Sequence, residues 1–76
     1  MEILKCIYNN QISDFIVKRT CITIKNHTFE KTLGFFDIRY YIYDNKLFIE
    51  DNYNTNLIIS GNNAKLLYKT IKKKNE

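Results

Sequence analysis

Two apolar arms joined by a two-residue turn constrain the fold of this chain more than any other feature. Residues 35–51 carry mainly β-branched and aromatic side chains on both sides of Asp44-Asn45, a composition typical of paired strands. Asp and Asn tolerate the positive φ angles that a two-residue type I′ turn requires. The stretch therefore predicts an antiparallel hairpin with its tip at Asp44-Asn45.

This turn also predicts the register of the two arms. Tyr41 is expected opposite Phe48, and Arg39 opposite Glu50. One face of the hairpin is then aliphatic, and its members are Ile38, Tyr40, Ile42, Leu47 and Ile49. The other face carries Tyr41, Tyr43 and Phe48, with Arg39 and Glu50 farther from the turn. A loop longer or shorter by one residue would mix the two faces.

Further apolar segments predict strands at Glu2–Tyr8, 12–18, Cys21–Lys25, 28–33 and 57–59. The first has apolar side chains at both odd and even positions, so we expect it to be buried on both faces. The second and third are either two strands or one long strand with a bend at Arg19-Thr20. Asn26-His27 is expected to form a second two-residue turn.

From Asn63 onward the spacing of apolar residues becomes that of a helix. Ala64, Leu67, Tyr68 and Ile71 recur at i, i+3, i+4 and i+7, which is the apolar stripe of an amphipathic helix. The predicted fold class is α+β, in one domain spanning residues 1–76. It has an antiparallel sheet of about five or six strands, a meander or a partly open barrel, with one C-terminal helix packed on it. This order of elements is similar to that of small pleckstrin-homology-type domains in topology alone, since no residue motif supports a family.

Composition limits the cellular setting. Glu2 and Lys5 interrupt the first residues, so we expect no signal peptide, and no apolar run approaches the ~20 residues that span a bilayer. Only two cysteines occur, Cys6 and Cys21, so we expect free thiols in a reducing cytoplasm. Ile, Lys, Asn, Tyr and Phe are abundant, and their codons are AT-rich. This favours an AT-rich bacterium or its phages and mobile elements.

No catalytic or metal motif is found, so we expect no enzyme, no metal and no cofactor. His27 is the only histidine, and the predicted hairpin places it at a turn tip, too far from Cys21 for a Cys-His pair. Cys6, Cys21 and His27 do not have zinc-site spacing. The oxygen-rich segment 51–56 lacks the glycine at position six and the distal glutamate of a calcium loop.

Two surfaces are candidates for contact with a partner. Arg39, Tyr41, Tyr43 and Phe48 form the aromatic face of the hairpin, and Tyr and Arg are favoured anchors in protein interfaces. The alternative is a nucleic-acid-binding face on the basic helix, composed of Lys65, Lys69, Lys72, Lys73 and Lys74. Both sets of residues also have a purely structural explanation. The aromatic residues would pack within the sheet, and the lysines would form the solvent-exposed face of the helix.

The leading hypothesis is a small non-enzymatic binding protein that inhibits or modulates a larger host protein or nucleoprotein complex by occupying its surface. For a chain encoded by a phage or mobile element, a CRISPR nuclease or another defence protein is a natural target, which would make it an anti-CRISPR protein. A homodimer through the aromatic face is an alternative, as is direct binding to nucleic acid.

Overall fold

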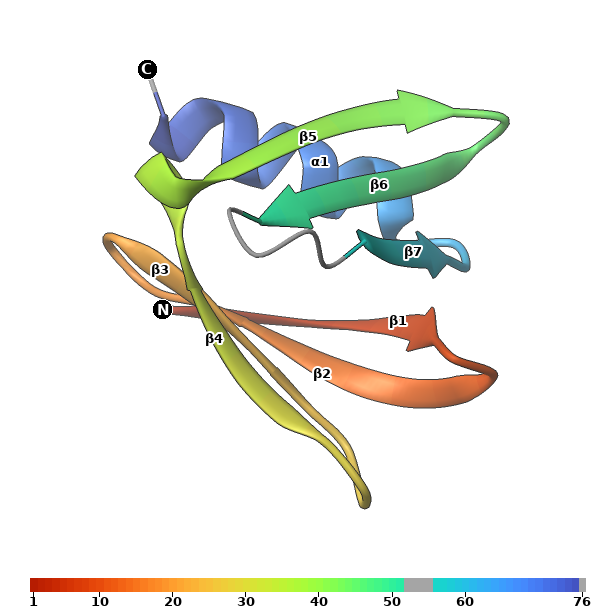
Figure 1. Ribbon diagram of the computed structural model, residues 1–76. Helices are drawn as coiled ribbons and strands as arrows, with labels where there is room; N and C mark the ends of the chain where they lie inside the picture. The colour runs from red at the N-terminus through yellow and green to blue at the C-terminus, as the bar shows by residue number, and fades with distance from the viewer. Residues whose placement is uncertain (52–55, 76) are drawn as a thin grey trace.

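The computed structural model describes residues 1–51 and 56–75. These residues form seven strands, a short 3-10 helix and one α-helix (Figure 1). The elements are β1 (Glu2–Tyr8), β2 (Gln11–Val17), β3 (Cys21–Lys25), β4 (Glu30–Gly34), η1 (Phe35–Asp37), β5 (Ile38–Tyr43), β6 (Lys46–Asp51), β7 (Asn56–Ser60) and α1 (Ala64–Lys74). The predicted antiparallel sheet with a C-terminal helix is thus confirmed.

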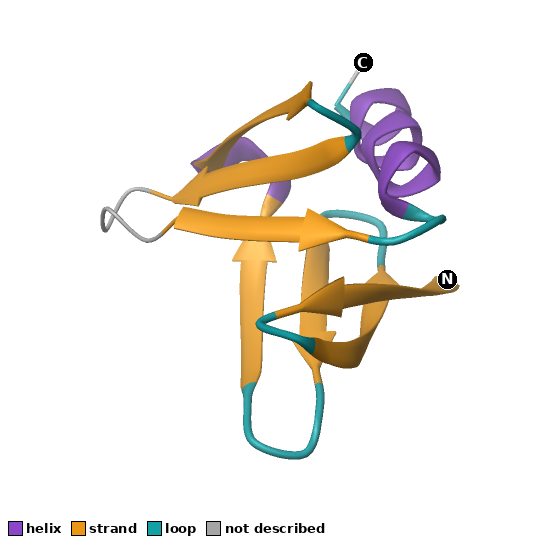
Figure 2. Ribbon diagram, turned by 90° about the vertical axis from the view of Figure 1, so that its right-hand side faces the viewer, coloured by secondary structure: helices purple, strands orange, loops and turns teal. Residues whose placement is uncertain are grey.

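All seven strands belong to one antiparallel sheet in the order β4-β3-β2-β1-β7-β6-β5. Two meanders, β1 to β4 and β5 to β7, are joined where Ile7 pairs with Ser60 and Tyr8 with Ile59. Figure 2 shows β3 and β4 at a steep angle to β7, while β1 runs alongside β7. The helix α1 contacts β5 and β6. Lys31 in β4 reaches Asp51 at the end of β6, with 2.8 Å between Nζ and Oδ2. The sheet therefore curls until strands far apart in its order approach each other.

The core fills the inside of this curl. Its buried side chains are Cys6, Phe15, Val17, Ile22, Ile24, Leu33, Phe35, Leu47, Ile49, Leu57, Ile59, Ala64, Leu67 and Ile71. Burial of each large apolar side chain contributes about 1.5–3 kcal/mol. Every strand except β5 contributes at least one member, so the two meanders and the helix share a single core.

The predicted number of five or six strands is wrong, because residues 12–25 form two strands rather than one. The chain reverses after Val17, and the backbone N–H of Lys18 donates to the carbonyl of Cys21 at 2.9 Å. Val17 is then opposite Ile22. The reversal places the buried apolar side chains of both strands on the concave face, namely Phe15, Val17, Ile22 and Ile24.

The central hairpin has the predicted turn and register. Tyr41 pairs with Phe48 and Arg39 with Glu50, while Asp44 and Asn45 adopt φ angles of +53° and +60°. The first arm is shorter than predicted, because residues 35–37 form the 3-10 helix η1 instead of strand. The backbone N–H of Phe35 donates to the carbonyl of Thr20 at 3.1 Å, which anchors this corner.

The predicted two-residue turn at Asn26-His27 is wrong. Lys25 pairs with Glu30, so the loop contains the four residues 26–29. The Asn26 side chain accepts a hydrogen bond from the Thr28 backbone N–H at 3.0 Å, and the Asn26 backbone N–H donates to the carbonyl of Phe29 at 2.9 Å. The side chain of Asn26 thus stabilises the wider loop. Asn occurs both in tight turns and in loops of this kind, so the residue type alone does not distinguish the two.

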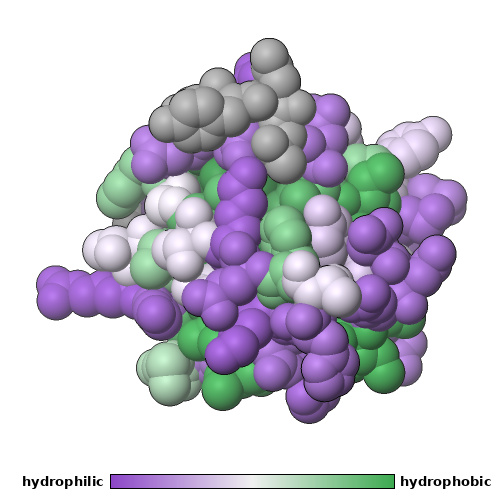
Figure 3. Space-filling model, turned by 60° about the horizontal axis from the view of Figure 1, so that its bottom comes forward, coloured by the Kyte–Doolittle hydropathy of each residue, from purple (hydrophilic) through white to green (hydrophobic). Residues whose placement is uncertain are grey.

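The prediction that β1 is buried on both faces is also wrong. Cys6 is buried on the concave face, but Ile3 and Ile7 on the other face are 56% and 39% exposed. Ile7 is directly opposite Ile12, which is 72% exposed. The helix covers only the concave side of the sheet, so apolar side chains on the convex side of β1 and β2 stay at the surface. Figure 3 shows the molecule from below, where hydrophobic patches lie between hydrophilic side chains.

The helix docks through the predicted stripe. Ala64, Leu67 and Ile71 are fully buried, and the rings of Tyr40 and Tyr68 meet edge to face with centroids 5.7 Å apart. Asn63 occupies the N-cap position without a side-chain cap bond, and its amide instead donates to the carbonyl of Lys5 at 3.0 Å.

The turn geometry leads to a prediction for Asp44. Proline cannot adopt its φ of +53°, because the ring holds φ near −65°. We expect Asp44→Pro to lower the free energy of unfolding by about 1–3 kcal/mol, and Asp44→Gly to change it by less than about 1 kcal/mol. Urea unfolding of the two variants measures the difference. Equal losses would mean that the turn conformation does not contribute to stability.

Candidate protein-binding surface

The convex face of β5, β6 and β7 carries a cluster of exposed or half-buried apolar side chains, here called the aromatic patch: Tyr41, Tyr43, Phe48 and Ile58. Tyr41 is 47% exposed, Tyr43 70% and Ile58 50%. Tyr41, Phe48 and Ile58 are neighbours in one row across β5, β6 and β7. Successive side chains of a strand point to opposite faces of the sheet, and these four point away from the core.

The centre of the patch is a stacked pair of rings. Tyr41 and Phe48 are nearly parallel, with centroids 5.1 Å apart and an interplanar angle of 6°. A depression of about 210 Å³ lies beside them, bordered by Ile58, Asn56 and Glu50 among other residues. Stacking restricts the movement of both rings, so they offer a rigid contact surface with little entropy to lose on binding.

Charged residues border the patch at the end away from the turn. Arg39 Nη2 lies 3.7 Å from Glu50 Oε2, and the Arg39 side chain is 85% exposed. An ion pair this exposed contributes about 0–1 kcal/mol, so it orients Arg39 more than it stabilises the fold. Arg39, Tyr41, Tyr43 and Phe48 therefore lie on one face, as the register predicted.

Ile58 was missing from the predicted site. The sequence indicated a strand at 57–59 but not which of its residues faces outward. Leu57 and Ile59 are buried, with 1% and 0% exposure, and the alternation then places Ile58 outside. Only the pairing of β7 with β6 shows that Ile58 lies next to Phe48.

The lysines of the alternative site lie along α1. All five are exposed. Lys69, Lys73 and Lys74 line a groove against the start of β1, together with Glu2, Leu66 and Thr70. Lys65 and Lys72 do not line this groove. Only three of the five lysines therefore line the groove.

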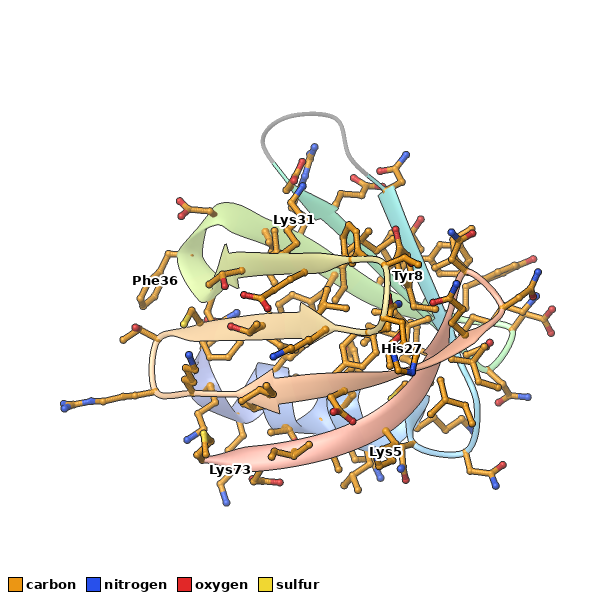
Figure 4. The ribbon with its side chains drawn as sticks, turned by 90° about the horizontal axis from the view of Figure 1, so that it is seen from below. Lys5, Tyr8, His27, Lys31, Phe36 and Lys73 are labelled. Carbon is orange, nitrogen blue, oxygen red and sulfur yellow. The ribbon has the colours of Figure 1, made fainter. Side chains whose placement is uncertain are left out.

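The residues weighed for chemistry lie apart from both surfaces. His27 is exposed in the loop between β3 and β4 (Figure 4), and Cys6 and Cys21 are free thiols. Among residues 1–51 and 56–75, no group of three or more His, Cys, Asp or Glu side chains has a geometry that could hold a metal ion. Four residues of segment 51–56, and with them Tyr53, lie outside the described residues.

Burial changes the acidity of one thiol. Desolvation raises the pKa of Cys6 from 9.0 to about 11, because the interior disfavours the charged thiolate. The protonated thiol is inert as a nucleophile at neutral pH. Cys6 is therefore a core residue rather than a reactive group.

The raised pKa predicts a loss of stability in alkali. The folded protein keeps the Cys6 proton up to about pH 11, whereas the unfolded chain releases it near pH 9.0. Stabilisation by this group is therefore complete below about pH 9 and is lost as the pH rises toward 11. We expect urea unfolding to show a smaller alkaline loss in Cys6→Val than in the unsubstituted chain. Identical losses would contradict the assignment to Cys6, since other groups also titrate in this range.

The fold and the patch define an α+β domain with a curled antiparallel sheet, a docked C-terminal helix and an exposed aromatic surface. Comparisons with protein-family models, curated proteins and solved structures found no match. Within its described part, the chain has no helix that is both long and apolar enough to cross a membrane.

Proposed function

We propose that this chain is a small non-enzymatic binding protein that modulates a larger protein by occupying its surface with the aromatic patch. The observation that carries this proposal is the exposure of Tyr41, Tyr43 and Ile58 beside the stacked Phe48. Contiguous apolar surface with a polar border is typical of protein interfaces, and Tyr and Arg are enriched among the residues that dominate binding energy. Arg39 and Glu50 supply the polar border.

A protein partner accounts for the patch better than nucleic acid does. Surfaces that stack bases combine aromatic rings with a positively charged groove. Here the positive charge of Arg39 is paired with Glu50, and Asp44 lies in the adjoining turn. An apolar partner surface requires no excess of positive charge and fits the depression next to Phe48.

The proposed target is a larger host protein, such as a CRISPR nuclease or another defence enzyme. The support is compositional: the residues favoured by AT-rich codons are those of AT-rich bacteria and of their phages and mobile elements. A small domain of 76 residues can inhibit a large enzyme by covering a functional surface, without chemistry of its own. The alternative to a host protein is a second copy of this chain, which would bind the same patch and form a homodimer.

The double substitution Tyr41→Ala with Tyr43→Ala tests the proposal. Removal of both rings is expected to weaken partner binding by about 2–4 kcal/mol, while circular dichroism stays unchanged because neither side chain lies in the core. Phe36→Ala is the matched control, since Phe36 is an aromatic residue with 84% exposure outside the patch. Binding is measured by affinity capture from the native host and then with the purified partner.

Salt and nuclease treatment distinguish the alternatives. Binding through the patch is expected to survive nuclease and to change little with salt, whereas binding of the helix lysines to phosphates falls steeply with salt. Sedimentation of the unsubstituted chain measures its mass in solution and so shows whether it forms a homodimer. Normal capture by the double variant would place the site elsewhere, and unfolding of that variant would show that the tyrosines are structural.

A further inference from the structure

A groove between α1 and the start of β1 has no part in the proposed function. Its volume is about 500 Å³, and it is lined by Glu2 from β1 and by Leu66, Lys69, Thr70, Lys73 and Lys74 from α1. Residues 66, 69, 70 and 73 recur at i, i+3, i+4 and i+7, so they form one flank of the helix. Figure 4 shows Lys73 beside the start of β1.

The backbone of β1 has an open edge on the side of this groove. Within the described part of the chain, β1 pairs with β7 only through Ile7 and Tyr8. The carbonyl of Lys5 accepts a hydrogen bond from Asn63 on the same side. Residues two apart in a strand direct their backbone groups to the same edge, so Ile3 presents its N–H and C=O toward α1. An open strand edge is a template for an added strand.

The lining of the groove has an excess of positive charge, which favours an acidic ligand. Lys69, Lys73 and Lys74 face a single acid, Glu2, among the lining residues. The ion pairs found in residues 1–51 and 56–75 join Lys5, Lys25, Lys31 and Arg39 to acids and use none of the helix lysines. The groove thus has an excess of positive charge, and Leu66, which is 48% exposed, adds an apolar contact.

We propose that this groove binds an extended acidic segment of a partner protein. The segment adds as a strand to the edge of β1 near Ile3, places carboxylates near Lys69 and Lys73, and rests an apolar side chain on Leu66. A peptide suits the site better than a polynucleotide does, because the strand edge offers alternating N–H and C=O groups, and phosphates use only donors. The groove is separate from the aromatic patch, which lies on the convex face of β5, β6 and β7.

Fluorescence anisotropy with a labelled synthetic peptide of alternating glutamate and valine tests this proposal. We expect saturable binding, and roughly tenfold weaker binding to Lys69→Glu with Lys73→Glu. The matched control is Lys65→Glu with Lys72→Glu, which changes the charge of the same helix outside the groove. A peptide N-methylated at alternate residues keeps its charge but loses half its backbone donors, so its binding is expected to be lost. Amide exchange at Ile3 should slow in the complex.

Several results would overturn the proposal. Absence of saturable peptide binding would do so, as would equal weakening by the two charge-reversed variants, which would indicate attraction to net charge alone. Unchanged affinity of the N-methylated peptide would exclude strand addition. Equally tight binding of oligothymidylate, with the same dependence on Lys69 and Lys73, would identify a phosphate site instead. All four substituted lysines are exposed, so the variants are expected to fold, and circular dichroism verifies this.

Discussion

Replacement of Phe15 by alanine is expected to lower the free energy of unfolding by about 3–5 kcal/mol. Phe15 is fully buried in β2, between Leu4 of β1 and Ile24 of β3 in one row of the sheet. Its removal leaves a cavity that rigid neighbouring strands cannot close. A domain of 76 residues has a thin core and a net stability of only a few kcal/mol, so much of the variant should be unfolded at 25 °C.

Urea unfolding followed by circular dichroism measures this loss. Ile12→Ala is the matched control in the same strand, because Ile12 is 72% exposed on the convex face. A substitution at such a position is expected to change stability by at most about 0.5 kcal/mol. If Phe15→Ala costs less than about 1 kcal/mol, the inside of the curled sheet is not a packed core.

The second large effect is expected at the helix. Leu67 has no exposed surface and lies in the stripe that docks α1 against β5 and β6. We expect Leu67→Ala to lower the free energy of unfolding by about 2–5 kcal/mol. The reason is that α1 covers the concave face, and the loss of one central side chain loosens the contact of the whole helix.

The adjoining residue supplies the control. Leu66 is the same residue type one position earlier in the helix, so its side chain points to a different side of α1, where it is 48% exposed. Leu66→Ala should change stability little but weaken peptide binding in the groove. Leu67→Ala should lower stability, and the fraction of the variant that still folds should bind the peptide normally. Similar stability losses for the two variants would show that α1 does not dock through the predicted stripe.

The two proposed surfaces use different physical contacts and can be tested separately. The aromatic patch offers rigid apolar area with a polar border, so its binding should tolerate salt. The groove offers lysines and a strand edge, so its binding should weaken with ionic strength. A partner with both an apolar surface and a neighbouring acidic segment would engage the two at once, and such joint binding is far tighter than either contact alone.

Local pattern alone determined the parts of this fold that depend on neighbours in the chain. Asp44-Asn45 predicted the hairpin because few residues adopt positive φ at low cost, and the register of Tyr41 with Phe48 followed from that turn. The docking stripe of α1 followed from the helical period of Ala64, Leu67 and Ile71. The same register predicted that Tyr41, Tyr43 and Phe48 share one face of the hairpin, but it left open whether that face is exposed or packed in the core.

Only the tertiary structure decided what depends on segments far apart in the chain. The loop at residues 26–29 is wider than predicted because the hydrogen bonds of the Asn26 side chain select it over a tight turn. Ile58 joins the patch through the pairing of β7 with β6. Ile3 and Ile7 stay exposed because nothing in the described chain covers the convex face of β1. The groove exists because β7 leaves β1 after two pairs and the chain turns into α1, a geometry set by packing and not by the period of any single segment.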